Sequence, residues 1–259
     1  MKCKICSGNI VRAFQAKILG KYDVGYFHCL DCGFLQTEEP YWLEEAYSNA
    51  IADADTGLVQ RNLYLSKTLS VLLFFVFDHE GKYLDVAGGY GMLTRLMRDA
   101  GFDYYWSDKY CENILARGFD AAADWSFTAV TAFEVLEHVP DPLGFVRESM
   151  ATAKSRNMIF STELFDGAPP QPESWWYYVF ETGQHVSFYQ RRTLQVIAQK
   201  LGLNCYSNGS LHLFTDKKIS SIGYRLLTHP RIGRALSWLP KFSMVSKTMT
   251  DHLDIMGRK

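Results

Sequence analysis

The sequence predicts an α/β protein, in which a doubly wound, Rossmann-like sheet follows a small N-terminal zinc ribbon and precedes a short helical tail. Three observations carry this prediction: two CxxC pairs within the first 32 residues, an apolar run that enters a glycine-rich turn at Gly88, and a basic, proline-punctuated C-terminus. A chain of 259 residues, 47% of them hydrophobic, can bury one large core or two smaller ones. We therefore expect a ribbon over residues 1–40, a helical connection over 41–78, a sheet domain over 79–216 and a basic helical tail over 217–259.

The cysteines near the N-terminus form two pairs with metal-ligand spacing. In each CxxC pair the two-residue gap lets a tight turn aim both thiolates at one ion, and two such pairs complete a tetrahedral zinc shell. Four thiolates leave no open position for water, so the predicted zinc is structural; buried or redox-active thiols are the alternative. The predicted zinc ligands are Cys3, Cys6, Cys29 and Cys32.

The segment between the two pairs, NIVRAFQAKILGKYDVGYFH, reads as short strands broken at Gly20 and Gly25. Gly8 and Gly33 follow the pairs closely, and we expect the chain to turn there with φ above zero. A segment this small has little core of its own, so zinc binding, worth on the order of 10 kcal/mol, is expected to fold it. The remaining cysteines, Cys111 and Cys205, are expected to be core or half-buried thiols.

Composition and charge narrow the class of protein. The formal net charge of -1 gives no global reason to expect a nucleic-acid or membrane partner. The longest apolar run, residues 69–77, is far shorter than the roughly 20 residues that a membrane-spanning helix needs. The segment MKCKICSGN does not have the pattern of a secretory signal. We therefore expect a soluble, cytoplasmic protein, in which paired cysteines are more often metal ligands than disulfides.

The stretch YLDVAGGYGML, residues 83–93, reads as a strand, a turn and the start of a helix, and it follows a segment over 43–77 that reads as helical. The strand covers 83–86, and MLTRLMRDAG has the apolar spacing of a helix. Glycine between them lets a ligand approach the backbone near a positive helix N-terminus, although tight turns without ligands share this pattern. The turn glycines are Gly88, Gly89 and Gly91.

Two further predicted strands end in polar residues. FDYYWSD, residues 102–108, ends in Asp108, which can accept hydrogen bonds from both hydroxyls of a ribose; a helix cap is the alternative role. An apolar strand over 127–133 leads into Glu134, Glu137 and His138. Later in the chain we expect a strand over 158–165, a helix over 187–203 and a final hairpin over 204–216. The turn does not have the GxGxxG spacing of nicotinamide-dependent oxidoreductases.

In this order and at these spacings, DVAGGYG, SDKY and TAFEVLEHVPDP resemble the successive motifs of class I S-adenosylmethionine-dependent methyltransferases, over roughly residues 69–216. The resemblance implies that the domain over 79–216 binds S-adenosylmethionine. Ala87 stands where the family usually has glycine, and alanine fits this place if φ is negative. The cofactor contacts that the resemblance implies are Asp85, Ala87, Gly88, Gly89 and Gly91 at the amino-acid end, Asp108 at the ribose, and Phe133 with Glu134 beside the methionine.

Methyl transfer is an in-line displacement, so the enzyme mainly positions the acceptor and, where needed, removes its proton. The proline- and aromatic-rich segment near 166–190 predicts an acceptor lid or pocket wall; a packed aromatic core is the alternative. Within it, His185 is the first candidate general base. Glu137 with His138 is the second candidate, with a structural or cofactor-side role as the alternative, and Glu163 is the third.

An N-terminal zinc-binding ribbon, this core and a histidine followed by Val-Ser and two aromatics also resemble the bacterial deoxysugar C-methyltransferases, which act on nucleotide-linked keto-sugars. This resemblance implies a transferase of the EC 2.1.1 type that acts on a small molecule or glycan, most directly a sugar or nucleotide-sugar in polysaccharide or secondary-metabolite biosynthesis. Residues 182–184 differ from that family's tyrosine, histidine and glutamate. O-methylation of a sugar hydroxyl is therefore an alternative to C-methylation.

Residues 217–250 carry seven Lys or Arg and no Asp or Glu, and they read as one or two amphipathic helices punctuated by Pro230 and Pro240. Such a tail attracts a membrane surface, a nucleotide-sugar diphosphate or nucleic acid, or is a solvated face over a hydrophobic stripe. Two rival functions remain: an RNA methyltransferase that grips phosphates with ribbon and tail, and a non-catalytic, zinc-dependent interaction protein with a methyltransferase-like fold. The modest charge of the ribbon disfavours nucleic acid, and the retained Asp85 and Asp108 disfavour the interaction protein.

Overall fold

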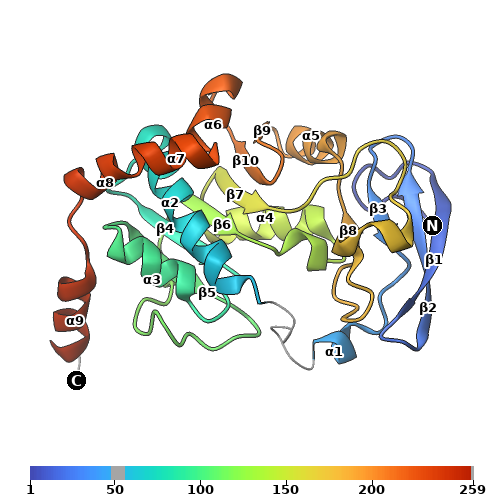
Figure 1. The fold of residues 1–259 in the computed structure, drawn as a ribbon, viewed down its shortest axis with the longest axis horizontal. Helices are drawn as coiled ribbons and strands as arrows, with labels where there is room; N and C mark the ends of the chain where they lie inside the picture. The colour runs from blue at the N-terminus through green and yellow to red at the C-terminus, as the bar shows by residue number, and fades with distance from the viewer. Residues whose placement is uncertain (48–55, 258–259) are drawn as a thin grey trace. The chain divides into compact units, whose positions relative to one another are not determined.

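The computed structural model describes residues 1–47 and 56–257 (Figure 1). The chain forms two compact units, which we describe one at a time. The ribbon unit comprises Met1–Ala52, Phe133–Glu148 and Phe160–Lys217, and the turn unit comprises Asp53–Ala132, Ser149–Ile159 and Lys218–Lys259. Part of the predicted helical connection, residues 48–55, lies outside the described residues.

The ribbon unit is built on an antiparallel sheet in the order β1-β2-β3-β8. Leu19 and Gly20, both with positive φ, turn the chain at the predicted glycine break between the first two strands. The second predicted break is wrong, because Gly25 lies inside β2, opposite Gln15. A Cβ there would lie 3.0 Å from the Phe27 ring, so this glycine makes room for a neighbour. The strands are β1 (Ile10–Ile18), β2 (Tyr22–Cys29), β3 (Leu35–Thr37) and β8 (Ser187–Phe188).

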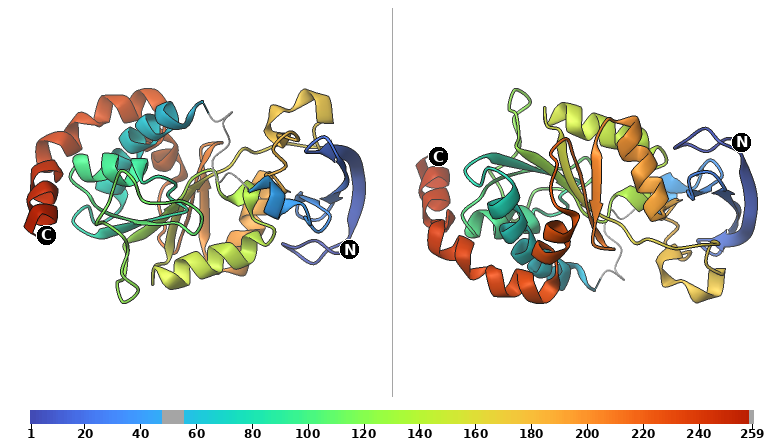
Figure 2. Two further views of the ribbon diagram at one scale, coloured as in Figure 1. Left: turned by 90° about the horizontal axis from the view of Figure 1, so that it is seen from below. Right: turned by 90° about the horizontal axis from the view of Figure 1, so that it is seen from above.

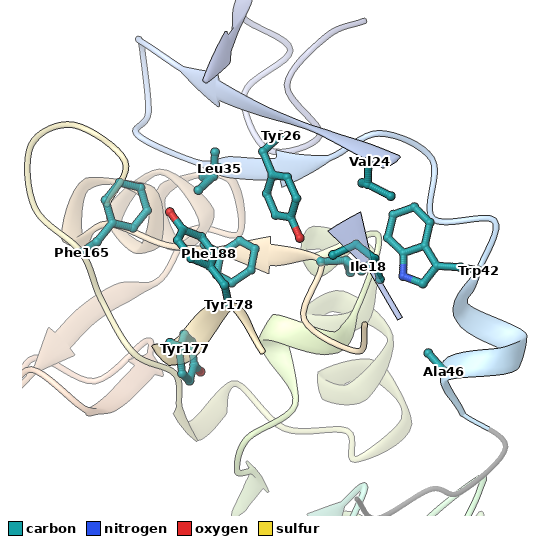
Figure 3. Close-up of a cluster of buried hydrophobic side chains, with 11 residues drawn as sticks. Ile18, Val24, Tyr26, Leu35, Trp42, Ala46, Phe165, Tyr177, Tyr178 and Phe188 are labelled. Atoms are coloured by element: carbon teal, nitrogen blue, oxygen red, sulfur yellow. The ribbon is translucent and has the colours of Figure 1, made fainter. Parts of the chain in front are cut away.

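An aromatic core joins this sheet to the segment that follows Phe165 (Figure 3). Tyr26 of β2 is fully buried, and its ring stacks on Phe14 at a centroid distance of 4.5 Å. Tyr178 meets the same ring edge-on at 5.9 Å. Trp42, just before the short helix α1 (Leu43–Ala46), donates a hydrogen bond from its indole to the Gly183 carbonyl at 2.8 Å. The ribbon therefore has a hydrophobic core, most of whose large members come from residues far apart in the sequence.

The turn unit holds the strand order β5-β4-β6 and the ribbon unit holds the neighbouring strands β10 and β9, and these arrangements confirm the Rossmann-like prediction. In the turn unit, β4 is parallel to both β5 and β6, and the helix that follows the glycine turn, α3, packs against β5 and α2. The helix α2 corresponds to most of the segment over 43–77 that the sequence predicts to be helical. These elements are α2 (Leu58–Val76), β4 (Lys82–Val86), α3 (Met92–Asp99), β5 (Asp103–Ser107) and β6 (Ala129–Ala132).

Two elements later in the chain differ from the prediction. β7 ends at Ser161, four residues early, because Leu164 and Phe165 pair instead with Tyr189. The helix α5 begins at Arg191, because a capping box between Gln190 and Thr193 starts it there while residues 187–188 pair with β3. The predicted final hairpin is confirmed. The remaining elements here are α4 (Pro142–Thr152), β7 (Asn157–Ser161), α5 (Arg191–Lys200), β9 (Asn204–Ser207) and β10 (Leu211–Thr215).

The basic tail is helical, as predicted. Three short helices, drawn in red in Figures 1 and 2, pack along α2 in the turn unit. They are α6 (Ser221–Leu227), α7 (Pro230–Leu236) and α8 (Trp238–Ser243), and a fourth, α9 (Thr248–Gly257), follows. Buried Asp251 anchors α9, because it pairs with Arg98 of α3 through two contacts of 2.7 Å.

Candidate functional site

The glycine turn of the turn unit joins β4 to α3 through backbone that only small residues adopt easily. Gly89 and Gly91 have φ of 55° and 83°, and Gly91 begins α3. Ala87 has φ of 54°, so the negative φ that would let alanine fit this position easily is not present. An alanine in the left-handed region is strained by about 1 kcal/mol or more. Gly88 is required for close packing instead, because a Cβ there would lie 2.8 Å from the Trp106 ring.

Asp108 holds this turn from the end of β5. Its Oδ2 accepts a hydrogen bond from the Gly89 amide at 2.9 Å. Its Oδ1 accepts from the amides of Tyr110 and Cys111 at 2.7 and 2.8 Å, but residues 109–115 contain bends and no helix, so Asp108 closes a turn and does not cap a helix. A carboxylate has about four acceptor positions, so this geometry leaves capacity for a further donor.

Asp85 lies behind the turn, near the end of β4, and is 3% exposed. Its Oδ1 accepts a hydrogen bond from the Thr131 hydroxyl at 2.8 Å, and the Tyr104 hydroxyl lies 2.9 Å from the same threonine. Burial raises the pKa of Asp85 to about 7, the Thr131 hydrogen bond opposes this, and the charge of Asp108 adds to it. The turn unit thus holds a carboxyl group that a nearby cation would ionise.

In the ribbon unit, Glu134 lies two residues beyond β6 with a strained backbone. Its φ is 54°, a left-handed value that a side chain of this size rarely adopts. Ser161, the last residue of β7, holds it twice: its Oγ accepts from the Glu134 amide at 2.9 Å and donates to the Glu134 carboxylate at 2.5 Å. Strain that is fixed by a neighbour in this way is typical of functional positions.

The three predicted catalytic residues come together in the ribbon unit. Glu137 and His138 lie on a single 3-10 turn, η1 (Leu136–His138), and His185 lies 47 residues later. One ligand atom from each side chain lies within 4.8 Å of the other two. The imidazole rings of His138 and His185 meet edge-on, with centroids 4.6 Å apart. The backbone joins the two segments, because the Val186 amide donates to the Glu137 carbonyl at 2.8 Å.

Tyr177 fixes the orientation of His185. The Nδ1 of His185 lies 2.7 Å from the Tyr177 carbonyl, which can only accept, so Nδ1 carries the proton and Nε2 carries the lone pair. The rings of the two residues also meet at a centroid distance of 4.7 Å. The Tyr177 hydroxyl is itself held by Thr162 at 3.2 Å and by the Glu163 amide at 3.1 Å. The outcome is a histidine with an oriented, proton-accepting nitrogen.

Burial sets the charge of this cluster. Glu137 is fully buried, and its two carboxyl oxygens make no hydrogen bond with any described residue. Burial, with repulsion from Glu134, raises the pKa of Glu137 to about 8. Burial lowers the pKa of His185 to about 4 and that of His138 well below its usual value. At neutral pH the cluster therefore holds one proton on Glu137 and no net charge, although the same three groups also match the ligand set of a divalent cation.

The aromatic segment divides between core and surface. Tyr177 and Tyr178 are buried in the core of Figure 3, whereas Trp176 is 76% exposed. A hollow of about 660 Å³ opens beside it, lined by β1 residues and by residues 172–181. The cluster residues do not line this hollow. The predicted third base, Glu163, has an exposed side chain.

The four N-terminal cysteines converge on one point. Their sulfurs all lie within 4.8 Å of one another, and the Cys3–Cys32 and Cys6–Cys29 pairs are 3.5 and 3.4 Å apart. Sulfurs around a tetrahedral zinc ion with bonds of about 2.3 Å are separated by about 3.8 Å, so this set has the required size. Contact between Cys3 and Cys32 lowers the pKa of one thiol and raises that of the other, as expected where thiols compete to hold one negative charge.

The two CxxC turns repeat the same backbone pattern. The Ser7 amide donates to the Cys3 carbonyl and the Gly33 amide donates to the Cys29 carbonyl, both at 2.9 Å. The positive φ that follows each pair lies at Gly33, as predicted, but at Ser7 rather than Gly8. Gly8 is small for a different reason, because a Cβ there would lie 2.1 Å from Asp31.

Several residues that organise these sites were not identified from the sequence. Thr131, Ser161 and Tyr177 hold Asp85, Glu134 and His185, respectively. A hydroxyl or backbone carbonyl acts here through a partner that is distant in the chain, and no spacing rule marks such a pair. Only the polar character of Thr131 and Ser161 within otherwise apolar strands was visible.

Comparison with known proteins places this architecture. The family model described as "Methyltransferase domain" matches residues 59–208, and no curated protein matches the sequence. Solved structures with a similar fold include TnmH, at 17% identity and a TM-score of 0.46, covering 68% of this chain and 61% of that chain. Magnesium protoporphyrin IX methyltransferase (ChlM) from Synechocystis PCC 6803 is 15% identical, with a TM-score of 0.39, covering 68% of this chain and 90% of that chain.

An O-methyltransferase family protein from Burkholderia thailandensis is 11% identical, with a TM-score of 0.46, covering 69% of this chain and 64% of that chain. This chain therefore spans about three fifths of the length of TnmH. The family model spans more than half of this chain and takes in the glycine turn, Asp108, Glu137 and His185. The chain thus belongs to the methyltransferase domain family.

Proposed function

We propose that the protein transfers a methyl group from S-adenosylmethionine to a small molecule or glycan, with a sugar or nucleotide-sugar as the first acceptor class to test. The observation that carries this proposal is the cluster of Glu137, His138 and His185, which offers a proton acceptor. Glu137 and His138 follow β6 closely and lie within the last of the three methyltransferase motifs. When bound, S-adenosylmethionine supplies an electrophilic methyl group and leaves as the thioether.

The turn unit fits the cofactor. Residues 87–91 present backbone with little side-chain cover, and Asp108 supports this turn while it keeps an acceptor position for a ribose hydroxyl. Asp85, whose raised pKa keeps a large fraction of it protonated near neutral pH in the free protein, would ionise beside the cationic amino-acid end of the ligand. Phe133 and Glu134 belong to the ribbon unit, are both half-buried and follow β6 directly, in keeping with the role beside the methionine that the family resemblance implies.

His185 is the proposed general base. Its Nε2 lone pair is free to take a proton from a hydroxyl or from a carbon acid next to a carbonyl, while Tyr177 holds the other nitrogen. The proton adds a charge to a buried ring, which is why the pKa of His185 is low. Ionised Glu137 would offset that charge, so proton uptake by His185 becomes easier as Glu137 loses its own proton.

Zinc is the proposed ion of the cysteine site. Four thiolates select zinc over harder cations, and no open position remains for a reacting group. The ribbon that this ion would stabilise also contacts the catalytic segment, because the Thr37 amide donates to the Val186 carbonyl at 3.1 Å. The proposed role is therefore structural: the metal holds the frame that positions His185.

A small or glycan acceptor is favoured over RNA by the charges of the ribbon. Each of its cations up to Gln36 has a partner within the unit, which leaves none dedicated to phosphate. The ion pairs are Lys4–Glu39, Lys17–Asp23 and Lys21–Glu45, and the hydrogen bonds are Lys2–Asn9 and Arg12–Gln15. The exposed ring of Trp176 beside the 660 Å³ hollow offers a stacking surface for a sugar ring.

The test is transfer of radiolabelled methyl from S-adenosylmethionine to a panel of nucleotide-sugars, free glycans and RNA. We expect label on the sugar class only, and a loss of about 10²- to 10⁴-fold in His185→Gln with unchanged cofactor binding. His252→Gln, at an exposed histidine of the tail, is the matched control and should keep full activity. Label on RNA alone would overturn the proposed acceptor class. Full activity in His185→Gln would overturn the assignment of His185 as the general base.

A further inference from the structure

The C-terminal helices of the turn unit expose an unusual number of large apolar side chains. Those of α6, α8 and the segment after them are between 49% and 85% exposed. We call this surface the tail face and define it by Ile222, Leu226, Trp238, Phe242 and Val245, with Arg225 and Arg231 among them. Apolar side chains of this size, gathered on consecutive helices, indicate a surface that is covered in use.

The tail face is one side of amphipathic helices whose other side is buried. In α6, Tyr224 is 1% exposed, whereas Ile222, Arg225 and Leu226 point to solvent. In α7, a Cβ added to buried Gly233 would come within 4.0 Å of Thr68 on α2, so this side of the helix faces α2. The outward positions therefore cannot be explained as packing against the unit's own core.

Helical spacing places the outward residues of α7 and α8 on a common side. Arg231, Ala235, Trp238 and Phe242 follow one another at steps of four, three and four, and all are exposed. Ser237 between the two helices keeps a helical backbone, so the path continues from one to the next. The rings of Trp238 and Phe242 meet edge-on at 5.7 Å and form an exposed aromatic pair.

Charge identifies what covers this surface. Of 27 Lys and Arg in the chain, seven lie in residues 217–250, where there is no Asp or Glu; the other 20 face all 28 acidic residues. No ion pair among the described residues involves Arg225 or Arg231. A second copy of this face would repel the first, and large aromatic and aliphatic groups contribute little to a phosphate grip on duplex nucleic acid.

We propose that the tail face docks on an anionic membrane surface, with Trp238 and Phe242 inserted at the level of the headgroups and Arg225 and Arg231 held near lipid phosphates. Basic residues beside exposed Trp, Phe and Ile are the composition of helices that lie in the bilayer interface. No helix in the described parts of the chain has the length and apolar character to cross a bilayer, so the contact would be peripheral. This proposal does not depend on the acceptor or on turnover.

The experiment is flotation of the full-length protein with vesicles of phosphatidylcholine, with and without phosphatidylglycerol. We expect wild-type protein to float with phosphatidylglycerol vesicles, and binding to fall at least tenfold in Trp238→Ala/Phe242→Ala and in Arg225→Glu/Arg231→Glu. Matched controls in the ribbon unit are Trp176→Ala, which removes another exposed tryptophan, and Arg12→Glu/Lys200→Glu, which makes the same charge change at exposed sites. Both controls should float like wild type.

Four results would overturn the proposal. Wild-type protein that does not float, or tail variants that float as well as wild type, exclude membrane docking by this face. A dimer on light scattering that dissociates in Trp238→Ala/Phe242→Ala, without vesicle binding, assigns the face to a second copy. RNA binding that is lost on charge reversal but kept in the aromatic variant, again without vesicle binding, assigns it to nucleic acid. Unchanged thermal unfolding shows that each variant is folded.

Discussion

The turn unit and the ribbon unit each bury a carboxyl group. Burial is the main cause that raises the pKa of Asp85 in the turn unit to about 7 and the pKa of Glu137 in the ribbon unit to about 8. Their surroundings differ. Asp85 accepts a hydrogen bond from Thr131, whereas neither oxygen of Glu137 has a hydrogen-bond partner among the described residues. Under the proposed function, Asp85, which Thr131 holds in place, is the fixed cofactor contact, and Glu137 is the group that stores a proton.

The largest effect is expected from a change at the cysteine site, which should affect the ribbon unit much more than the turn unit. Cys29→Ser removes one of four predicted zinc ligands, and because zinc would contribute on the order of 10 kcal/mol to folding, we expect the ribbon unit to lose its structure. Methyl transfer should disappear, and cofactor binding should weaken but persist, because Phe133 and Glu134 lie in the ribbon unit whereas Asp85 and Asp108 lie in the turn unit. Near-ultraviolet circular dichroism, transfer of radiolabelled methyl and calorimetry measure the three quantities, and metal analysis measures the bound zinc. Cys205→Ser, at a half-buried cysteine outside the cluster, is the control.

Asp85→Asn is expected to weaken cofactor binding by about 100-fold or more. The same substitution is expected to stabilise the free protein. The pKa of Asp85 is raised to about 7 from an unfolded value near 4, so the folded state binds the extra proton, and this group's contribution to stability is lost as pH rises from about 4 to 7. Above pH 7, asparagine removes a penalty on the order of 2–4 kcal/mol. Thermal unfolding at pH 5 and pH 8 checks this; a variant that is less stable at pH 8 would contradict it.

Glu137→Gln tests the proton store. Glutamine imitates the protonated acid, so we expect activity within about threefold of wild type at pH 7. Wild-type activity should rise as pH passes through about 8, where Glu137 ionises, and this rise should be absent in the variant. A pH–rate profile measures both. If the Glu137→Gln variant has no activity at pH 7, and an added divalent cation restores the activity of the wild-type protein, the cluster binds a metal instead.

The smallest effect concerns the backbone of the turn. Ala87 has φ of 54°, where glycine has no steric penalty, so Ala87→Gly should raise the free energy of unfolding by about 1 kcal/mol. Urea unfolding measures the change. Ala121→Gly, in a loop outside the turn, is the control, and it should be neutral or destabilising. A destabilised Ala87→Gly variant would show that the strain is absent.

Sequence reasoning succeeded where local chemistry fixes geometry. The strand before Gly88, the positive φ at Gly33, and the convergence of two CxxC turns all follow from residues close in sequence. It failed at Gly8 and Gly25, because a glycine marks either an unusual φ or a close neighbour, and only the fold distinguishes the two.

The candidate site was predicted as residues but not as an assembly. Glu137 and His185 were named separately, and nothing in their spacing indicated that Tyr177 would fix one ring nitrogen or that the carboxyl group would lack a partner. These properties depend on tertiary contacts between η1 and the segment before β8. Burial, which sets the proton inventory of the cluster, is likewise a property of the folded chain.

The most direct test of the account is a calorimetric titration of the zinc-replete protein with S-adenosylmethionine, comparing wild type, Asp108→Ala and His185→Gln. We expect stoichiometric binding by wild type, loss of binding in Asp108→Ala, whose carboxylate holds the Gly89 amide, and full binding in His185→Gln. That pattern would assign a cofactor contact to Asp108 in the turn unit and would show that His185 is not needed for cofactor binding. No binding by the wild-type protein would contradict the methyltransferase activity and favour a zinc-dependent interaction protein that keeps only the fold.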